Sequence, residues 1–328
     1  MNHTLRNHST RALLLLLGVL SPMFNVMAGG LVFPRDGWVS WEIETIAAAP
    51  AWCCFDWRSR NTSKAECQLD GPSQGYGSSD DDEGVSKMRV YAHFTLSKLD
   101  RLRALAISCP VVTKNAVQPL DAVTAEASLR WLTTVVTPHS KLSDDALAAL
   151  AVHKGDTAND ALGQIARSDA STENRKQALF WATQLRGADG LRMTLPFLFD
   201  DKDARVREHA AFAVAQTKSP QAVAALIKQG REDASTQVRA QAWFWLAQTG
   251  AADAEAAIRS ALATESSRHV REQAVFALSQ LPEPQNIAAL VRIAEDRSLA
   301  RGDRKQALFW LGQSQSAEAM KYLDKLLL

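Results

Sequence analysis

The sequence predicts a mainly α-helical protein, an α-solenoid of stacked helix pairs that follows a smaller, strand-containing and disulfide-linked domain. Three observations predict this fold class. A segment recurs five times, about every 32 residues, in the C-terminal part of the chain. All four cysteines fall between residues 53 and 109. The content of 46% hydrophobic and 22% charged residues is typical of a folded globular protein.

Residues 1–28 have the three parts of a secretory signal peptide. Two arginines precede an apolar run from Ala12 to Leu20, which is too short to span a bilayer as a helix. Val26-Met27-Ala28 supplies small residues at a cleavage site, so the mature chain would begin at Gly29. The style of the signal is bacterial, and we expect a periplasmic or secreted protein without a membrane span.

The charge balance argues against a nucleic-acid partner. The chain has a formal net charge of +1, and removal of residues 1–28, with two arginines and no acid, would lower it to −1. Proteins that bind nucleic acid usually carry a marked basic excess.

The cysteines predict two disulfide bonds. Cys53, Cys54, Cys67 and Cys109 all follow the predicted cleavage site, and an even number of cysteines in an oxidising compartment indicates paired thiols. A bond between the adjacent pair would be strained, which leaves 53–67 with 54–109, or 53–109 with 54–67. Metal or redox chemistry is the alternative, although the spacing contains no CxxC pair and no nearby histidine.

Residues 29–135 are predicted to form the N-terminal domain, with some β structure. The alternation from Val39 to Ile46 indicates a strand. Residues 90–96 and 102–108 indicate a hairpin that ends near Cys109, with the turn between them at 97–101.

Residues 136–328 are predicted to form the solenoid. Five ten-residue segments share Arg at the first place, Ala at the fourth, Phe at the sixth and Gln at the tenth. They are RKQALFWATQ from Arg175, REHAAFAVAQ from Arg207, RAQAWFWLAQ from Arg239, REQAVFALSQ from Arg271 and RKQALFWLGQ from Arg304. Each is the second helix of a helix pair, and residues 144–153 resemble a degenerate opening unit.

An acid lies six residues before the repeat arginine in four of the units. The pairs are Asp169 with Arg175, Asp201 with Arg207, Asp233 with Arg239 and Glu265 with Arg271. The fifth unit has Ser298 at that distance from Arg304 and one additional residue. Asn174 and Asp303, directly before the arginine in the first and fifth units, suit helix N-caps.

This pattern of acids and arginines resembles the HEAT repeat, in the short form known from phycobilisome lyases. The chain is also similar to exported bacterial HEAT-repeat proteins with a cysteine-bearing N-terminal domain. The resemblance implies that the acid and arginine pairs form a ladder that keeps neighbouring units in register. It also implies that the second helices line the concave face. It does not imply lyase chemistry, because the repeats define no active site.

The candidate binding surface is the row of aromatic and amide residues on the second helices. In the third unit, Val238, Ala242 and Leu246 mark the core face, and Trp243 falls on the opposite side. One hypothesis is that each Phe packs between units and each Gln satisfies backbone groups. The other is that the row holds an extended peptide or the chain's own N-terminal domain. The residues are Phe180, Trp181, His209, Phe212, Gln241, Phe244, Trp245, Gln273, Phe276, Phe309 and Trp310.

No catalytic or cofactor motif is present, and we interpret His209 as a variant of the repeat glutamine. We therefore expect a non-catalytic scaffold that binds a protein or peptide partner, with a sensory or regulatory role in the cell envelope and without a metal or cofactor. The alternatives are redox or other catalysis in the N-terminal domain and binding of a small hydrophobic ligand in the concave groove. The chain ends in Leu326-Leu327-Leu328 without a polar capping unit, which allows self-association at that end.

Overall fold

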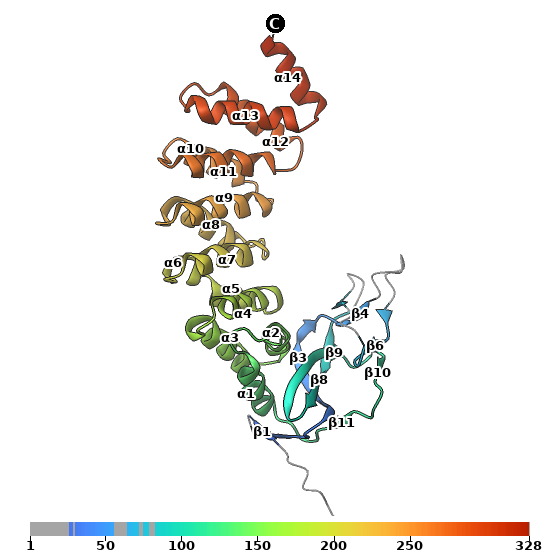
Figure 1. Cartoon of the computed structure of the whole chain (residues 1–328). Helices are drawn as coiled ribbons and strands as arrows, with labels where there is room; N and C mark the ends of the chain where they lie inside the picture. Colours follow the sequence, from blue (N-terminus) through green and yellow to red (C-terminus); the bar gives the residue numbers. More distant parts are fainter. Residues whose placement is uncertain (1–25, 29, 56–63, 72–74, 79–82, 328) are drawn as a thin grey trace, which may run out of the picture.

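A column of helix pairs stands beside an N-terminal β region (Figure 1). The computed structural model describes residues 26–28, 30–55, 64–71, 75–78 and 83–327. Most of the predicted signal peptide lies outside the described residues; its last three residues, Val26–Ala28, form strand β1. None of the helices in these described ranges is both long and apolar enough to cross a bilayer.

The centre of the N-terminal region is a four-stranded sheet with the order β11-β3-β8-β9. Its strands are β3 (Gly37–Ala49), β8 (Val85–Thr95), β9 (Lys98–Ala106) and β11 (Gln118–Pro119). The predicted hairpin is present, but its turn is formed by Leu96 and Ser97 alone, both with positive φ. Two successive residues in the left-handed backbone conformation match the twist of the flanking strands. Pairing between the strands therefore continues up to Thr95 and Lys98.

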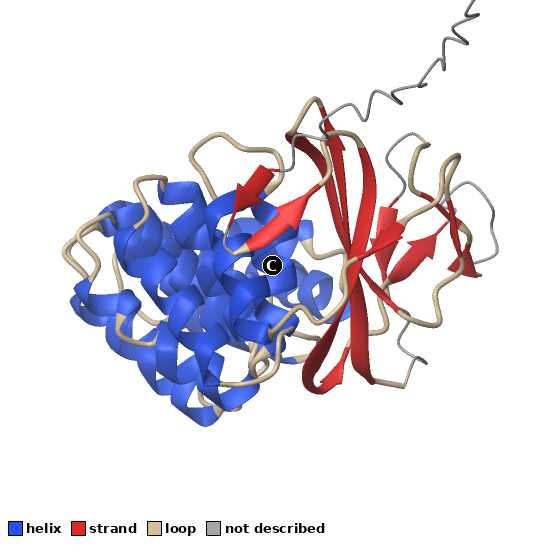
Figure 2. Cartoon of the chain, turned by 90° about the horizontal axis from the view of Figure 1, so that it is seen from below, coloured by secondary structure: helices blue, strands red, loops and turns tan. Residues whose placement is uncertain are grey.

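The two faces of this sheet are covered by different layers (Figure 2). Val39, Trp41 and Ile43 alternate along β3 and join one continuous core with the first helices. Trp38, Tyr91 and Leu105 lie on the other face and pack with the four cysteines. The remaining strands are β1 with β2 (Leu31–Phe33), β4 (Cys53–Phe55), β5 (Lys64–Ala65), β6 (Cys67–Gln68), β7 (Gly75–Gly77) and β10 (Val111–Val112).

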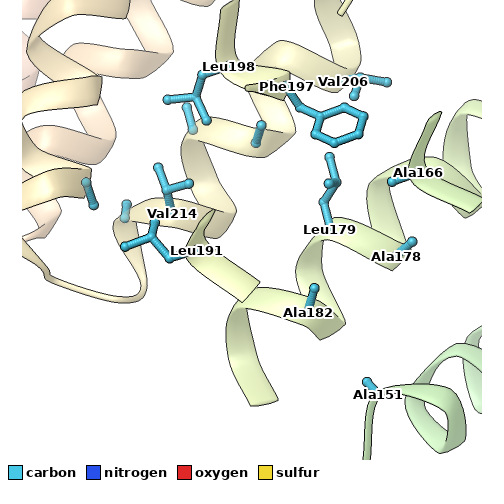
Figure 3. Packing of buried hydrophobic residues seen from close by; sticks show 14 of the residues in the cluster. Ala151, Ala166, Ala178, Leu179, Ala182, Leu191, Phe197, Leu198, Val206 and Val214 are labelled. Atoms are coloured by element: carbon cyan, nitrogen blue, oxygen red, sulfur yellow. The ribbon is translucent and has the colours of Figure 1, made fainter. Parts of the chain in front are cut away.

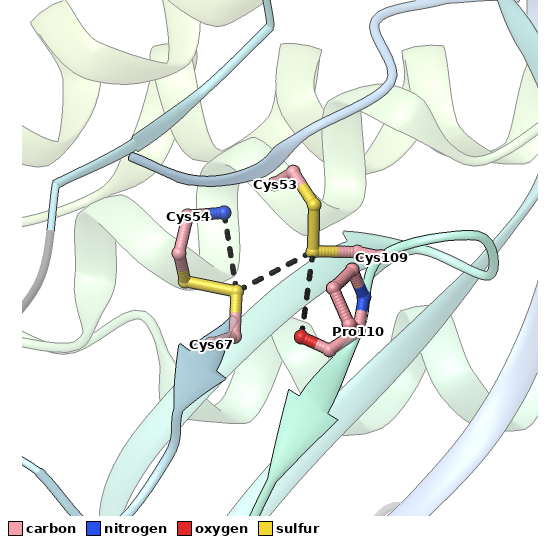
Figure 4. Close-up of a disulfide and its surroundings, with 5 residues drawn as sticks. All are labelled: Cys53, Cys54, Cys67, Cys109 and Pro110. Carbon is pink, nitrogen blue, oxygen red and sulfur yellow. Dashed lines mark hydrogen bonds between the residues drawn. A yellow bond between two sulfur atoms is a disulfide. The ribbon is translucent and has the colours of Figure 1, made fainter. Parts of the chain in front are cut away.

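All four cysteines form disulfides, Cys53 with Cys109 and Cys54 with Cys67 (Figure 4). The Cys67 and Cys109 sulfur atoms lie 3.5 Å apart, so the two bonds form one buried cluster. This is one of the two pairings that the sequence left open. It ties β4 both to β6 and to the end of the hairpin.

The helical region starts with the pair α1 (Ala125–Val135) and α2 (Ser143–Val152), of which α1 lies in the range that we assigned to the N-terminal domain. Five further second helices carry the repeated segments, and first helices alternate with them. The second helices are α4 (Thr172–Leu185), α7 (Ala204–Ala215), α9 (Thr236–Gln248), α11 (Arg268–Ser279) and α13 (Arg301–Gln313). The first helices are α3 (Asp156–Ser168), α5 (Gly187–Thr194) with α6 (Phe197–Asp200), α8 (Pro220–Glu232), α10 (Ala254–Leu262), α12 (Gln285–Glu295) and α14 (Ala317–Leu327).

The two kinds of helix bury different amounts of their surface. The first helix α10 buries one stripe, Ala254, Ala257, Ile258, Ala261 and Leu262, at helical spacing. The second helix α9 is buried on several sides because it packs on α8 of its own unit and on α7 and α11 of the neighbours. Figure 3 shows this burial between neighbouring units: Leu179 of α4, Phe197 of α6 and Val206 of α7 point toward one another.

Trp243, on the side of α9 opposite Val238, Ala242 and Leu246, is fully buried. Its ring packs so closely on Gly230 of α8 that a Cβ atom at Gly230 would lie 2.5 Å from it. The N-cap predictions were wrong. Ser171 caps α4, and the side chain of Asn174 instead donates to Asp169. Asp303 lies inside α13, where it binds an arginine.

The first four repeat arginines reach forward to the next unit. Arg207 donates to both carboxylate oxygens of Asp233 at 2.7 and 2.9 Å and to the Asp201 carbonyl at 2.8 Å. Arg239 contacts both oxygens of Glu265 and the Asp233 carbonyl in the same way. The series of bridges, called the ion ladder below, consists of Arg175–Asp201, Arg207–Asp233, Arg239–Glu265 and Arg271–Asp303.

The ends of the ion ladder differ from its middle. Asp169 precedes the first bridge and accepts from the Ser171 backbone and Asn174. Arg304 donates to the carbonyls of Arg297 and Leu299. In the fifth unit, Ser298 stands six residues before the arginine, where the other units have an acid, because this unit has one additional residue in its turn. The carboxylate that Arg271 binds is instead that of Asp303.

A buried polar chain joins the sheet to the first helix pair. Trp41 Nε1 donates to Ser128 Oγ at 2.9 Å, and Ser128 Oγ lies 2.9 Å from His153 Nε2. His153 Nδ1 lies 2.7 Å from the Ala149 carbonyl, which can only accept, so Nδ1 carries the proton and Nε2 accepts from Ser128. Burial lowers the pKa of His153 to about 4.

Substitution in the ion ladder will show how much each bridge stabilises the stack. Arg239→Ala leaves the half-buried Glu265 without its partner and should lower the free energy of unfolding by about 3 kcal/mol in urea denaturation. Arg304→Ala is the matched control, because among the described residues Arg304 donates hydrogen bonds to backbone carbonyls and not to a carboxylate, and it should cost about 1 kcal/mol or less. Equal losses in the two variants would contradict a stabilising role of the bridges between units.

The two disulfides should contribute unequally to stability because they close loops of different length. The sequence separations are 56 residues for Cys53–Cys109 and 13 for Cys54–Cys67. Loop-closure entropy then predicts losses of about 4 and about 3 kcal/mol for the paired serine variants. Thermal denaturation of the two double variants tests this order, and a larger loss for Cys54→Ser/Cys67→Ser would contradict it.

Acid should weaken the fold through His153. The ordinary pKa of 6.5 falls to about 4 on folding, so the unfolded chain binds a proton that the folded chain excludes. Above about pH 6.5, His153 is neutral in both states and does not lower the stability of the fold. As the pH falls from 6.5 toward 4, the free energy of unfolding decreases by up to about 3 kcal/mol. Unfolding free energies should be measured in a His209→Gln background, because His209 has a similarly lowered pKa. Adding His153→Asn should flatten the pH dependence in this window, and an unchanged slope would contradict the assignment.

Candidate functional site

The second helices carry a continuous row of aromatic rings in mutual contact. Consecutive ring centroids are separated by 4.8 to 5.9 Å. This row, called the ring ladder below, runs in the order Trp181, Phe180, Phe212, Trp245, Phe244, Phe276, Trp310 and Phe309. The structure therefore brings together all the aromatic residues that the sequence proposed for partner binding.

The ring ladder has a period of two units. Phe180 stacks directly on Phe212 with ring planes 5° apart, and Phe244 stacks on Phe276 with planes 4° apart. Between these stacked pairs, Trp245 lies between Phe212 and Phe244. The sequence signal for this period is the alternation of Trp and Ala at the seventh place: Trp181, Ala213, Trp245, Ala277 and Trp310.

The N-terminal domain supplies the first ring of the row. The opening unit has Ala148 at the place where the later units have Phe, and Trp52 contacts Trp181 instead, at 5.7 Å and 70°. Trp52 is only 6% exposed, and Trp181 Nε1 donates to Asp144 at 2.7 Å. The domain thus contacts one end of the ring ladder and packs mainly on α1 and α2.

The ring ladder is half-buried along its length and ends in Phe309, which is 56% exposed. The first four Phe rings therefore pack between units, as one hypothesis held, and keep part of their surface exposed, as the other requires. Glutamines border the rings at the third and tenth places, because places 3, 6 and 10 fall on one helix face.

The tenth-place glutamines are candidate binding residues that our sequence-based site omitted. They are all exposed: Gln184, Gln216, Gln248, Gln280 and Gln313. The third-place residues, Gln177, His209, Gln241, Gln273 and Gln306, are half-buried. Packing does not explain why an exposed residue recurs in all five units. Recurrence of a polar residue at a place outside the predicted core face is the sequence signal that could have identified the tenth place.

A cleft of about 420 Å³ lies beside the ring ladder in the first three units. Its lining consists of Lys176, Arg205, Glu208, His209, Phe212, Gln241 and Trp245. Burial lowers the pKa of His209 to about 4, so its imidazole is neutral at physiological pH.

Other cavities have the ion ladder in their walls. One of about 440 Å³ includes Arg175 and Asp201, and one of about 380 Å³ includes Arg239 and Glu265. These charged groups already pair with each other between units. We therefore assign these two cavities to the structural framework and take the ring-ladder face as the candidate site.

The part of the chain that the structure describes contains no group of three His, Cys, Asp or Glu side chains arranged to hold a metal ion. The cysteines are joined in disulfides, and His153 belongs to the buried chain from Trp41.

Comparisons with known proteins identify the repeat. A family model described as HEAT repeats matches residues 159–235 and 223–308. No curated protein matches the chain.

Two solved structures are similar to the chain at 20% sequence identity. Human deoxyhypusine hydroxylase in complex with glycerol aligns with a TM-score of 0.31, over 58% of this chain and 74% of that protein. A designed armadillo repeat protein in complex with a peptide aligns with a TM-score of 0.30, over 61% of this chain and 91% of that protein. The family match itself assigns HEAT repeats to residues 159–308, and the described solenoid extends beyond them, with the pair α1 and α2 before and the helix α14 after.

Proposed function

We propose that this protein is an exported, non-catalytic scaffold whose ring ladder binds an extended peptide segment of a protein partner. HEAT-repeat solenoids are common protein-interaction scaffolds. The observation that carries the proposal is the continuous, half-exposed ring ladder with an exposed glutamine beside each unit.

The ring ladder suits the side chains of a peptide. Partly exposed aromatic rings gain free energy when a partner covers them, and aromatic residues are enriched at the cores of interfaces. The stacked rings hold one another in place, so little side-chain entropy remains to be lost on binding.

The glutamines suit the backbone of an extended peptide. Each side-chain amide offers two donor hydrogens and an accepting oxygen, which can satisfy a peptide N–H and C=O. The repeat places such an amide on every unit along the same direction as the rings. An extended segment, whose backbone groups do not pair internally, would meet these amides in turn.

The N-terminal domain leaves room for such a partner. The domain is the alternative occupant of the row, and its ring contact with the ladder is through Trp52 at Trp181. Phe212, Phe244 and Phe276 remain half-buried in the presence of the domain.

Two features support export to the periplasm or the medium. Residues 1–28 have the layout of a signal peptide, and two buried disulfides persist best in an oxidising compartment. A sensory or regulatory role in the cell envelope would follow from partner binding in that compartment.

The tenth-place glutamines provide the test, because their exposed side chains can be changed without disturbing the core. Peptides selected from a random library on the wild-type chain should bind the triple variant Gln216→Ala/Gln248→Ala/Gln280→Ala at least about tenfold more weakly, since each lost amide bond is worth about 1 kcal/mol. Calorimetry on purified full chains measures the difference.

The matched control is Gln221→Ala/Gln285→Ala, which removes exposed amides from the first helices α8 and α12. Its affinity should equal that of the wild type. Selected peptides that bind both variants as tightly as the wild type, or that lose affinity equally in both, would contradict binding along the ring ladder.

A further inference from the structure

The two disulfide bonds are in direct contact with each other. Cys67 Sγ lies 3.5 Å from Cys109 Sγ, although each of these sulfurs is bonded to a different cysteine (Figure 4). No other atom fits between two sulfurs at this distance. A thiolate on either sulfur would therefore lie directly beside a bonded sulfur of the other disulfide.

The backbones that carry these two sulfurs also lie side by side. Strand β6 pairs with β10 in parallel, and Cys67 N donates to the Pro110 carbonyl at 2.8 Å. Neighbouring strands are about 4.8 Å apart, and a disulfide joins Cα atoms that are about 4.4 to 6.8 Å apart. A bond between Cys67 and Cys109 thus suits the arrangement of the strands, although the oxidised chain does not contain it.

We propose that the two disulfides form one exchange pair that responds to a dithiol reductant. A dithiol that reduces Cys53–Cys109 is itself oxidised to a disulfide and leaves two thiols. The Cys109 thiolate attacks Cys67 Sγ, the Cys67–Cys109 bond forms, the Cys54–Cys67 bond breaks, and Cys54 leaves as a thiolate that takes up a proton. If Cys54–Cys67 is reduced first, the Cys67 thiolate attacks Cys109 Sγ and Cys53 leaves. Both routes give the same product, in which Cys67 and Cys109 are bonded and Cys53 and Cys54 are thiols.

The surroundings of the sulfurs favour exchange between neighbours in space. Cys54 N donates to Cys67 Sγ at 3.1 Å, and such a donor stabilises negative charge on that sulfur. Each bond has one cysteine with some exposure, Cys54 at 5% and Cys109 at 7%, whereas Cys67 is 0% exposed. Attack on Cys67 therefore comes from Cys109 rather than from a reductant in solution.

The exchange frees strand β4 from both of its covalent ties. β4 carries Cys53 and Cys54, which in the oxidised chain bind it to the hairpin end and to β6. Trp52 directly precedes this strand and contacts Trp181 at the end of the ring ladder. The oxidation state of the cysteines thus controls how firmly the first ring of the row is held. This control does not depend on peptide binding.

Limited reduction of the full oxidised chain tests the exchange. The chain is treated briefly with dithiothreitol, its free thiols are alkylated with N-ethylmaleimide, and the remaining bond is mapped by mass spectrometry. The singly reduced species should contain Cys67–Cys109, with both Cys53 and Cys54 alkylated. A singly reduced species that contains only Cys53–Cys109 or only Cys54–Cys67 would overturn the proposal.

Two single variants provide matched controls, because each removes one member of the same bond. Cys53→Ser leaves the Cys109 thiol against Cys67, so this variant should yield Cys67–Cys109 with a free Cys54. Cys109→Ser removes the contacting sulfur and should keep Cys54–Cys67 with a free Cys53. Rearrangement in both variants, or in neither, would contradict exchange through the contact between Cys67 and Cys109.

Hydrogen exchange measures the release of β4. In the singly reduced wild-type chain, the amides of residues 52–55 should lose protection relative to the oxidised chain, while those of the β8–β9 hairpin keep theirs. Unchanged protection at residues 52–55 would show that the exchange does not loosen β4 and would remove the control of the first ring.

Discussion

The bridge from the arginine of one unit to the carboxylate of the next is the interaction on which the geometry of the solenoid depends. Apolar packing drives the helix pairs together, but the hydrophobic effect is non-directional. The guanidinium binds a carbonyl of its own turn and the carboxylate of the next, as Arg207 does with Asp201 and Asp233. Both contacts are satisfied only in one register, so each bridge sets the position of the following unit.

The ring ladder is a consequence of that register. Phe180 and Phe212 are 32 residues apart in the sequence, and their rings are nearly parallel because their helices are nearly equivalent in position. Where the seventh place is Trp, its ring fills the space between two Phe rings, and where it is Ala the rings meet directly. The same framework holds the cleft beside the ring ladder between α4, α7 and α9. Structural and binding residues thus share the second helix but occupy different faces of it.

The N-terminal region closes one end of this stack. Its sheet shares a core with α1 and α2, and the chain from Trp41 through Ser128 to His153 adds directional bonds to that contact. Trp52, next to the disulfide-bonded Cys53, takes the position of the Phe that the opening unit lacks. At the other end of the row, Phe309 is 56% exposed.

The sequence by itself determined the helix pairs, their spacing, the presence of two disulfides and the place of each aromatic ring within its unit. These properties follow from local periodicity and from residue types, which act over a few residues of chain. The tertiary structure decided which cysteines pair, that Asp303 replaces the acid missing from the fifth turn, and that Trp243 is buried against Gly230. It also decided that Asp144 accepts from Trp181 and Glu272 from Arg268. Each of these outcomes depends on groups that are distant in sequence or on competing neighbours in space, and a one-dimensional pattern does not contain those distances.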